Sequence, residues 1–451
     1  MLEHIEGASM VISAPAARLS RRRVLGGAFA IAAGATALAA CDSHGSSGSA
    51  GVLNVWGGVP EDSGPGDMIA AFEKANPGIK VKYTRYVNDP TGNLKLDTAL
   101  QGGVPIDVIF NYGPPKVSKR VAAGLLVDLS EKIAAESSFA KFAAGATPRA
   151  NYVFDGKVYT VPAARSPQLV MANADLLDKA GIEIPADWDV EDYHRIAKQL
   201  TVGSVNGSLG SPAIGVPTLG PDANYTKGGQ GSNFAAAAWR KQVELGVEMQ
   251  NDRSAVPHKT VLAQKLQTFA QNAFLGGQFA MLSTQAFLVR YISDTKQYPH
   301  SFKVRAYPVP APVKGKAYWN PGAYGDLMSI SAKSSQKDAA WTFLKYWVTN
   351  AGAYMIKGGR LPSLPDPAKK ADAISQLLGP DMTKLYDVDS FGAVLFDPAI
   401  KIPVDTIFTA STEIADLQTK LNDQAYLGSI SVDQWVQRMT AQSDAAIRKA
   451  S

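Results

Sequence analysis

The stretch 155–177, DGKVYTVPAARSPQLVMANADLL, most constrains how this chain can fold. Val158, Thr160 and Pro162 alternate with Lys157, Tyr159 and Val161, which makes this run strand-like. We expect this strand to end at Pro162, because proline has no N–H to donate to a neighbouring strand. The second apolar run, 168–172, leads into a helix over 174–180 that Gly181 closes. The pattern therefore predicts a strand, a small polar connection at 163–167, a second strand and a helix.

The part of the chain before this stretch alternates between strand-like and helix-like segments. We expect strands over 52–56, 79–84 and 105–110, with helices over 67–74 and 92–101 between them. This rhythm predicts a mostly parallel sheet. Ligands of such sheets lie beyond the carboxyl ends of the strands. The loops after Trp56 and Phe110 are therefore candidates for a binding site.

The rest of the chain predicts further strands and helices, and its last part is mostly helical. We expect strands over 211–216, 276–282, 302–308 and 327–331, helices over 187–200, 232–249, 259–275 and 337–349, and an almost entirely helical segment over 366–451. The helix 337–349 is amphipathic, with Ala340, Phe343, Leu344 and Trp347 on its inner face. Trp239, Trp341 and Trp347 lie in helical patterns, so we expect them in the core.

The N-terminal segment has the features of an export signal. Residues 1–40 join a cationic block, Arg21-Arg22-Arg23, to an Ala-rich apolar run that ends at Ala40. Leu38-Ala39-Ala40-Cys41 resembles the lipobox of bacterial lipoproteins, in which the cysteine carries the lipid. Cys41 is the one cysteine of the chain, and lipidation explains it better than a chance cysteine in an ordinary signal peptide. Residues 41–51 would be the lipidated cysteine and a Ser/Gly-rich flexible tether.

The export route stays open on the sequence alone. Ser20-Arg21-Arg22-Arg23-Val24-Leu25 resembles a twin-arginine (Tat) signal, but a plain basic segment of a general secretory signal would look similar. The charge of the chain is modest, at +5 formally, and four arginines and two glutamates of that total lie in 1–40. The remainder is too weakly basic to indicate nucleic-acid binding. No apolar run after the signal approaches the roughly 20 residues that a membrane helix needs.

The sequence contains few signs of catalysis. The five histidines are spread out with no metal-ligand spacing, so we expect no metal and no other cofactor. The Gly-rich run 228–231 lacks the Lys-Ser/Thr of a P-loop and is expected to be an ordinary loop. Glu61 and Asp107 could be imagined as the acid and base of a glycosidase. Asp107 precedes a buried strand, however, where an aspartate more often caps or pairs at the start of the strand.

Several motifs together resemble one known family. They are D-G-K-x-Y-x-V-P with N-x-D-L-L-x-x-A-G in 155–181, F-E-K-x-N-P-G-I in 72–79, and I-S-A-K-S-x-x-K-D-A-A-W in 330–341. The chain thus resembles the extracellular solute-binding proteins of bacterial ABC importers, closest to the maltose-binding-protein-like family 1. The resemblance covers roughly 52–451. It implies a two-lobed α/β fold of the periplasmic-binding-protein type, each lobe a mostly parallel sheet flanked by helices.

The resemblance also implies how the lobes divide the chain. The first lobe would comprise 52–164 and 327–358, and the second 168–324 and 361–451. Hinge crossings would lie near 163–168, 322–327 and 358–362. In that family the chain crosses from lobe to lobe through the floor of the ligand cleft.

The function that the resemblance implies is transport, without catalysis. The protein would be a monomeric lipoprotein on the extracytoplasmic face of the cell membrane, capturing a carbohydrate and delivering it to ABC permease subunits. A glycerophosphodiester or another anionic polyol is an alternative ligand, because Arg165 and Arg360 could hold a phosphate bidentately. The Ala164–Pro167 stretch, A-R-S-P, also resembles that subgroup. A secreted carbohydrate-active enzyme is the third alternative.

Sugar binding requires flat apolar rings beside groups that hydrogen-bond to hydroxyls. The candidate ligand-binding residues are Trp56, Glu61, Asn111, Tyr112, Arg165, Ser166, Gln168, Tyr225, Gln285, Phe287, Trp319, Tyr324 and Arg360. The aromatic members of this set could equally pack in a core. Residues 165–168 would face the cleft if the crossing is a hinge, and would be solvated if it is a surface bend.

Replacement of Cys41 tests the lipoprotein interpretation. Cys41→Ser removes the thiol that would carry the lipid, so we expect the protein to move from the membrane fraction to the soluble exported fraction. Cell fractionation with immunoblotting measures this change, and Ser43→Ala in the tether should leave the protein on the membrane. A Cys41→Ser protein that stays quantitatively in the membrane fraction would contradict the interpretation.

Overall fold

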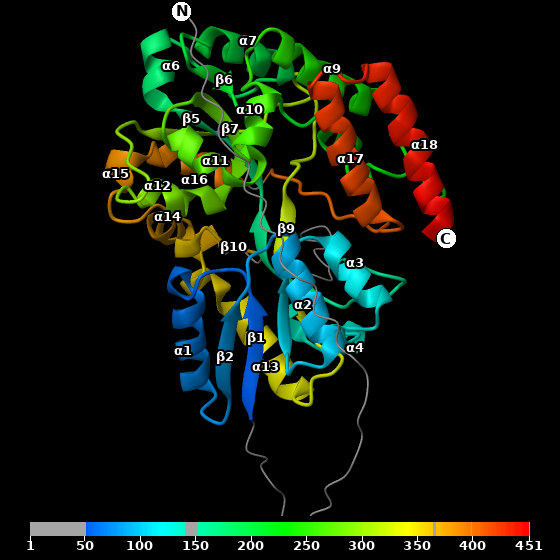
Figure 1. Ribbon diagram of the computed structural model, residues 1–451. Coiled ribbons are helices and arrows are strands. Elements are labelled where there is room, and N and C mark those ends of the chain that lie inside the picture. The colour runs from blue at the N-terminus through cyan, green and yellow to red at the C-terminus, as the bar shows by residue number, and fades with distance from the viewer. Residues whose placement is uncertain (1–50, 140–151, 364–366, 398, 451) are drawn as a thin grey trace, which may run out of the picture. The chain divides into compact units, whose positions relative to one another are not determined.

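The computed structural model describes residues 51–139, 152–363, 367–397 and 399–450 (Figure 1). The signal segment, Cys41 and the tether up to residue 50 lie outside the described residues. In the described part, no helix combines the length and the apolar character needed to cross a membrane.

Two β-sheets organise the described residues. Their strands are β1 (Val52–Gly57), β2 (Lys80–Arg85), β3 (Val108–Asn111), β4 (Val161–Ser166), β5 (Gln168–Asn173), β6 (Asn206–Ser208), β7 (Phe279–Gln285), β8 (Val304–Pro308), β9 (Ala323–Ile330) and β10 (Leu361–Pro362). The first sheet has the order β10-β4-β9-β3-β1-β2, and the second has the order β6-β7-β5-β8.

Helices surround both sheets. They are α1 (Pro65–Ala75), α2 (Pro90–Gly102), α3 (Pro114–Ala122), α4 (Ser130–Ala134), α6 (Ala174–Ala180), α7 (Val190–Leu200), α8 (Gly215–Leu219), α9 (Ala237–Asn251), α10 (His258–Ala263), α11 (Leu266–Leu275), α12 (Val289–Ser293), α13 (Lys337–Tyr354), α14 (Lys370–Leu378), α15 (Met382–Leu385), α16 (Val388–Leu395), α17 (Ser411–Tyr426) and α18 (Val432–Ala450). Short 3-10 turns are η1 (Glu61–Ser63), η2 (Ser137–Phe139), η3 (Ala286–Leu288), η4 (Ile356–Gly358) and η5 (Pro367–Lys369).

The sheets are mixed, and not mostly parallel as the sequence predicted. The strands β1, β2 and β3 are parallel to one another, but β9 runs antiparallel to β3 and to β4. In the second sheet, β5 runs antiparallel to both β7 and β8, and the β6–β7 pair is parallel. The β4–β9 pair is antiparallel because β4 carries the chain towards the second sheet and β9 carries it back to the first. The strand–helix rhythm of the first hundred residues could not reveal these crossings.

The first lobe consists of the first sheet with α1–α4 and α13. The α13 residues expected to point inward, Ala340, Phe343, Leu344 and Trp347, are all buried in its core. Phe343 packs edge-on against Phe72 of α1, with ring centroids 4.9 Å apart. Figure 1 shows α13, in yellow, beside the blue elements β1, α1 and β2, although about 250 residues or more separate them in the chain. The amphipathic pattern of α13 therefore predicted its buried face correctly.

The second lobe consists of the second sheet with α6–α12 and α14–α18. The apolar run of β5 is fully buried at Leu169, Val170, Met171 and Ala172. Asp189 caps α7 by accepting the backbone N–H groups of Glu191 and Asp192. The helices α9, α17 and α18 share a separate cluster that includes Trp239, so the expectation that Trp239 is a core residue is confirmed.

The strand expected over 211–216 is absent, and α8 begins in its place. Gly215 lies against Trp239, and an added Cβ would come within 2.3 Å of the indole ring. Gln242 Oε1 accepts the backbone N–H groups of Ile214 and Gly215, which satisfies donors at the start of the helix. Both partners come from α9, so a tertiary contact overrides the local strand pattern.

The single helix expected over 259–275 is broken into α10 and α11. Lys265 interrupts it with φ 55° and ψ 37°, a left-handed conformation. The sequence around Lys265, VLAQKLQT, contains neither glycine nor proline, so no local signal marks the break. For a residue with a Cβ this conformation is unfavourable by about 1–2 kcal/mol.

Replacement of Lys265 by glycine should therefore stabilise the protein. Lys265 is exposed, and Lys265→Gly relieves its backbone strain, so we expect the free energy of unfolding to rise by roughly 0.5–1 kcal/mol. The neighbouring exposed Gln264 has φ −93°, and Gln264→Gly should lower the same quantity by a similar amount. Denaturant unfolding of both variants measures the difference. Equal destabilisation by both would contradict the strain at Lys265.

Candidate functional site

The first crossing between the sheets consists of β4 and β5, with Pro167 alone between them. The prediction that the first strand ends at Pro162 is wrong, because β4 runs through Pro162 to Ser166 and pairs with β9. On its other side, β4 pairs with β10 only at Ala164 and Arg165. Beyond this pairing, the Ser363 hydroxyl donates to the Pro162 carbonyl at 2.7 Å.

The second crossing leads into β9 and is joined to the first by Asn320. The Asn320 side chain accepts the Gln168 N–H at 2.8 Å and donates to the Gln168 carbonyl at 2.9 Å. The same oxygen accepts the Gly322 N–H at 2.8 Å. The Asn320 backbone N–H donates to Lys401. The buried side chain of Asn320 thereby connects the two crossings, and its backbone N–H binds the segment that contains Lys401.

The third crossing, from η4 into β10, passes against the second lobe at Gly359. Gly359 has φ 77°, and an added Cβ would lie 2.6 Å from the Phe287 Cα atom, so glycine is required there. The next residue, Arg360, lies beside the buried Asp326 of β9, with Nε 3.4 Å from Oδ2. Burial raises the pKa of Asp326, although Arg360 acts in the opposite direction.

Tyrosines at the carboxyl ends of β2 and β3 lie near this pair. The Tyr112 hydroxyl accepts the Gly58 N–H at 2.6 Å, and the Tyr83 hydroxyl donates to the Val59 carbonyl at 2.9 Å. Burial raises the pKa of Tyr112 well above its usual value, and the charge of Asp326 adds to this effect. Tyr112 and Arg360 of the predicted set are therefore brought together around Asp326, which the sequence analysis did not select.

A segment that sequence reasoning missed also connects the lobes. Residues 399–409, here called the strap, join α16 to α17 and were expected to be helical. Ile402 and Val404 of the strap are buried in the core of the first lobe. Phe408 packs on Tyr152 and Phe154 of the same lobe, with ring centroids 6.2 and 4.7 Å apart. Pro403 was the local signal that this segment is not a helix.

The strap is held to the second lobe by a reciprocal pair of aspartates. Asp405 Oδ1 accepts the Asp222 N–H at 2.7 Å. The Asp222 carboxylate in turn accepts the backbone N–H groups of Thr406 and Ile407 and the Thr406 hydroxyl, at 2.7 to 2.9 Å. Tyr225 donates its hydroxyl to the Thr409 carbonyl at 2.9 Å.

A cavity of about 180 Å³ lies where these parts meet, and we call it the interlobe cavity. Its walls come from the first lobe, the second lobe, the second crossing and the strap. The lining residues are Pro114, Tyr152, Val216, Asp222, Ala223, Asn224, Tyr225, Pro321, Gly322, Ala323, Pro403 and Asp405. Of the predicted set, Tyr225 lines this cavity.

A second, larger cavity of about 510 Å³ lies beside the first crossing. It is bordered by Gln168, Asn320, Tyr318, Lys316 and the beginning of the strap. Its walls belong mostly to the second lobe, whereas the interlobe cavity has walls from both lobes.

Four further residues of the predicted set gather at the first crossing. Arg165, opposite Tyr324 of β9, donates from Nη2 to the Leu395 carbonyl at 2.9 Å, while its buried Nε has no partner within the described structure. Burial lowers the pKa of the Arg165 guanidinium. Gln285 donates to the Ser166 carbonyl at 3.3 Å. Arg165 therefore joins β4 to the end of α16, in the other lobe.

The remaining predicted residues are dispersed. Trp56 and Asn111 are buried in the first lobe, where the Asn111 amide donates to the Leu327 carbonyl and the Ser329 hydroxyl. Glu61 is exposed on η1. Phe287 lies on η3 with the Arg290 guanidinium 5.9 Å from its ring centre. Trp319 is half-buried against Gly220.

The imagined glycosidase pair is not supported by the surroundings of Asp107. Its carboxylate is buried and accepts the Asn54 N–H at 2.8 Å and the Ser334 hydroxyl at 2.6 Å. The backbone N–H of Asp107 also donates to the carbonyl of Asn54 in β1. Asp107 thus pairs at the start of β3, as the sequence analysis preferred.

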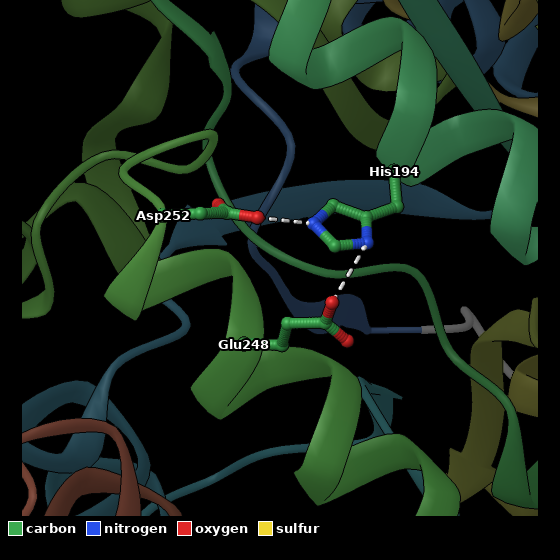
Figure 2. Close-up of side chains that lie close together, drawn as sticks. All are labelled: His194, Glu248 and Asp252. Atoms are coloured by element: carbon green, nitrogen blue, oxygen red, sulfur yellow. Dashed lines mark hydrogen bonds and ion pairs between the residues drawn. The ribbon is translucent and has the colours of Figure 1, made fainter.

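One cluster in the described residues has the residue types of a metal site. His194, Glu248 and Asp252 lie together on the second lobe, as Figure 2 shows. The two imidazole nitrogens point to different carboxylates, Nε2 to Asp252 at 2.6 Å and Nδ1 to Glu248 at 3.9 Å. Lys198 lies 3.0 Å from Asp252 and 4.0 Å from Glu248. The ammonium group already supplies the positive charge, so the arrangement is that of an ion-pair network.

Comparison with known proteins gives consistent matches. Residues 58–354 match the family described as bacterial extracellular solute-binding protein. A putative binding protein of Brucella abortus (strain 2308) is 25% identical over 403 residues, which cover 85% of this chain and 89% of the relative. An uncharacterized lipoprotein of Streptomyces antibioticus is 25% identical over 328 residues, covering 67% of this chain and 68% of the relative.

A solved structure has the same fold. The ABC substrate-binding protein of Listeria monocytogenes in complex with cycloalternan superposes with a TM-score of 0.68 at 20% identity, covering 88% of this chain and 98% of that one. The predicted two-lobed α/β fold is thereby confirmed, whereas the exact lobe boundaries and the ligand-binding residues stay predictions.

The network around His194 should make stability depend on pH in acid. Burial alone would raise the pKa of Asp252, but the hydrogen bond from the Ser254 N–H and the contacts of Lys198 and His194 outweigh it and lower the pKa from 3.8 to about 2. This stabilisation is present above about pH 4 and is lost as the pH falls towards 2. Because the group is partly exposed, we expect the loss to be roughly 1 kcal/mol.

Denaturant unfolding measured at several pH values between about 5 and 2.5 tests this dependence. Asp252→Asn should flatten the curve, while Asp416→Asn, at an exposed position of α17, should leave its slope as in the unmodified protein. An unchanged slope in Asp252→Asn would contradict the assignment.

Proposed function

Because this chain belongs to the bacterial extracellular solute-binding protein family, we propose that it captures a carbohydrate between its two lobes and delivers it to an ABC permease. The observation that carries this proposal is the interlobe cavity, whose lining comes from both lobes, from the second crossing and from the strap. A ligand in this cavity would touch Tyr152 of the first lobe and Tyr225 of the second at the same time.

The side chains around the cavity suit a polyhydroxyl ligand. Tyr152 and Tyr225 offer apolar ring surface, and Asn224 and Asp405 offer hydrogen-bond acceptors. An anionic polyol is less well supported, because both arginines considered for it have internal partners. Arg165 donates to the Leu395 carbonyl, and Arg360 lies beside Asp326.

The mechanism we propose is closure of the lobes about the crossings. A shift from mostly open to mostly closed molecules requires about 5.5 kcal/mol of preference of the ligand for the closed form. A micromolar ligand has about 8 kcal/mol of binding free energy in total. Most of this free energy must therefore come from contacts that exist only when both lobes reach the ligand, as the mixed lining of the interlobe cavity would allow.

We further propose that the protein acts as a monomeric lipoprotein, anchored through Cys41 on the extracytoplasmic face of the membrane, and that it binds its ligand without converting it. The Cys41 motif and the relative described as a lipoprotein support the anchor. The internal hydrogen bonds of Asp107 speak against the imagined acid–base pair. Incubation with oligosaccharides followed by product analysis would reveal any hydrolysis.

Thermal-shift measurements with monosaccharides, oligosaccharides, sugar alcohols and glycerophosphodiesters test the ligand class. A ligand at a hundredfold excess over its Kd stabilises the folded protein by about 2.7 kcal/mol. We expect a neutral or amine-bearing carbohydrate to give such a shift and glycerophosphodiesters to give none.

A cavity-filling variant locates the site in the same experiment. Ala323 lines the interlobe cavity, so Ala323→Leu should weaken binding of the carbohydrate at least tenfold, about 1.4 kcal/mol. Ala415→Leu, at an exposed position of α17, serves as the matched control and should bind normally. If folded Ala323→Leu protein binds as tightly as the control, the ligand lies elsewhere.

A further inference from the structure

The charged side chains that line the interlobe cavity are all acidic. Asp222 and Asp405 both line it, and neither carboxylate lies within ion-pair distance of a lysine, arginine or histidine among the described residues. The two aspartates are adjacent, because the Asp222 N–H donates to Asp405. Burial raises the pKa of Asp405 and outweighs the hydrogen bond from the Asp222 N–H, which lowers it; the negative charge of Asp222 acts in the same direction as burial.

The cavity also has more free hydrogen-bond acceptors than free donors. The side-chain oxygen of Asn224 is buried and has no hydrogen-bond partner among the residues that the structure describes. Only Oδ1 of Asp405 is used in the hydrogen bonds described above, so its second oxygen remains available. We refer to Asp222, Asn224 and Asp405 together as the acceptor cluster.

Donors at the same cavity are scarce. Pro114, Pro321 and Pro403 line it and have no N–H group. The Tyr225 hydroxyl donates to Thr409, and the Tyr152 hydroxyl to Tyr324. The Gly322 N–H donates to Asn320.

The amino end of α3 also borders the cavity, and such an end ordinarily attracts anions. Pro114 and Pro115 occupy its first two positions, which removes two of the N–H groups. The next N–H, of Lys116, donates to the Gly113 carbonyl. The helix therefore contributes little to anion binding here.

These observations distinguish the groups that a ligand can place in the cavity. A hydroxyl donates one hydrogen bond but also presents lone pairs that require donors, whereas an ammonium group has three donors and no acceptor. An ammonium group would also compensate the two carboxyl groups. A phosphate or carboxylate would meet like charge and few donors, chiefly the side-chain amide of Asn224.

We infer that the acceptor cluster binds a protonated amine of the ligand, so that the transported solute is an amino-substituted carbohydrate. This inference rests on the proposed function and specifies its substrate class. The recognised chemistry is a primary ammonium group on a polyhydroxyl ring, with the ammonium between Asn224 and Asp405.

Matched sets of three sugars test the inference by calorimetry at neutral pH. Each set consists of a neutral sugar, its 2-amino analogue and the N-acetylated analogue, in which the charge is removed while the nitrogen is kept. Glucose, glucosamine and N-acetylglucosamine form one such set, and the corresponding disaccharides form another. We expect the amino sugar of at least one set to bind at least tenfold more tightly than both of its neutral partners.

Two variants assign this preference to the acceptor cluster. Asp405→Asn keeps the shape and an oxygen for the Asp222 N–H but removes the charge, so the preference for the amine should fall at least fivefold. Asn224→Asp adds a carboxylate and should increase the preference. Glu413→Gln removes one charge from an exposed position of α17 and should leave the preference unchanged. Thermal unfolding of the unliganded variants checks that each is folded.

The possible outcomes separate the two proposals. Equal binding of neutral and amino sugars would overturn the inference and leave the carbohydrate function intact. An amine preference that survives in folded Asp405→Asn would also overturn it, because the amine would then bind elsewhere. Binding of simple alkylamines with no binding of any sugar would contradict the proposed carbohydrate function. Binding of a divalent metal that competes with the amine, abolished by a chelator, would assign the cluster to a metal and overturn the inference.

Discussion

The side chain of Asn320 is the contact on which the connection between the two lobes depends. Its amide group hydrogen-bonds to both the N–H and the carbonyl of Gln168. These are the two hydrogen bonds that a residue of a neighbouring strand would otherwise make with Gln168. It also fixes the turn at Gly322 that leads into β9. The first two crossings are therefore joined where the first enters the second sheet and the second approaches the first sheet. Bending between Gln168 and Gly322 would break three hydrogen bonds, so the lobe closure proposed above should leave this junction intact.

Buried charges near the crossings have different partners on the two lobes. Asp326 has Arg360 beside it, and both belong to segments that cross between the lobes. Asp222 is held by three donors of the strap, while Asp405 receives one donor and faces the cavity. A carboxyl group that is buried without a cation is unfavourable unless something else supplies donors. The difference between Asp326 and Asp405 is the physical reason to look for a cationic group in the ligand.

The candidate site combines residues that sequence reasoning selected with residues that it passed over. Tyr112, Arg360 and Tyr225 were selected because aromatic rings and arginines in loops are typical of sugar sites. Asp326, Asn320 and Asp405 carry as much of the local chemistry but stand in strand or loop segments without a motif. Asp405 lies in a mainly apolar run with Pro403, and this proline was a sign that the run is not helical.

The sequence alone determined the features that depend on near neighbours in the chain. The apolar face of α13 and the buried strands β3 and β5 follow from periodicity and turn residues that act over a few positions. Tertiary structure decided the rest: the course of β4 through Pro162, the helix in place of a strand at Gly215, and the strap between the lobes. Each depends on a partner far along the chain, namely β9, Trp239 and the core around Phe154. Such contacts leave no local pattern, because their energy comes from burial and hydrogen bonds that form only when the chain is folded.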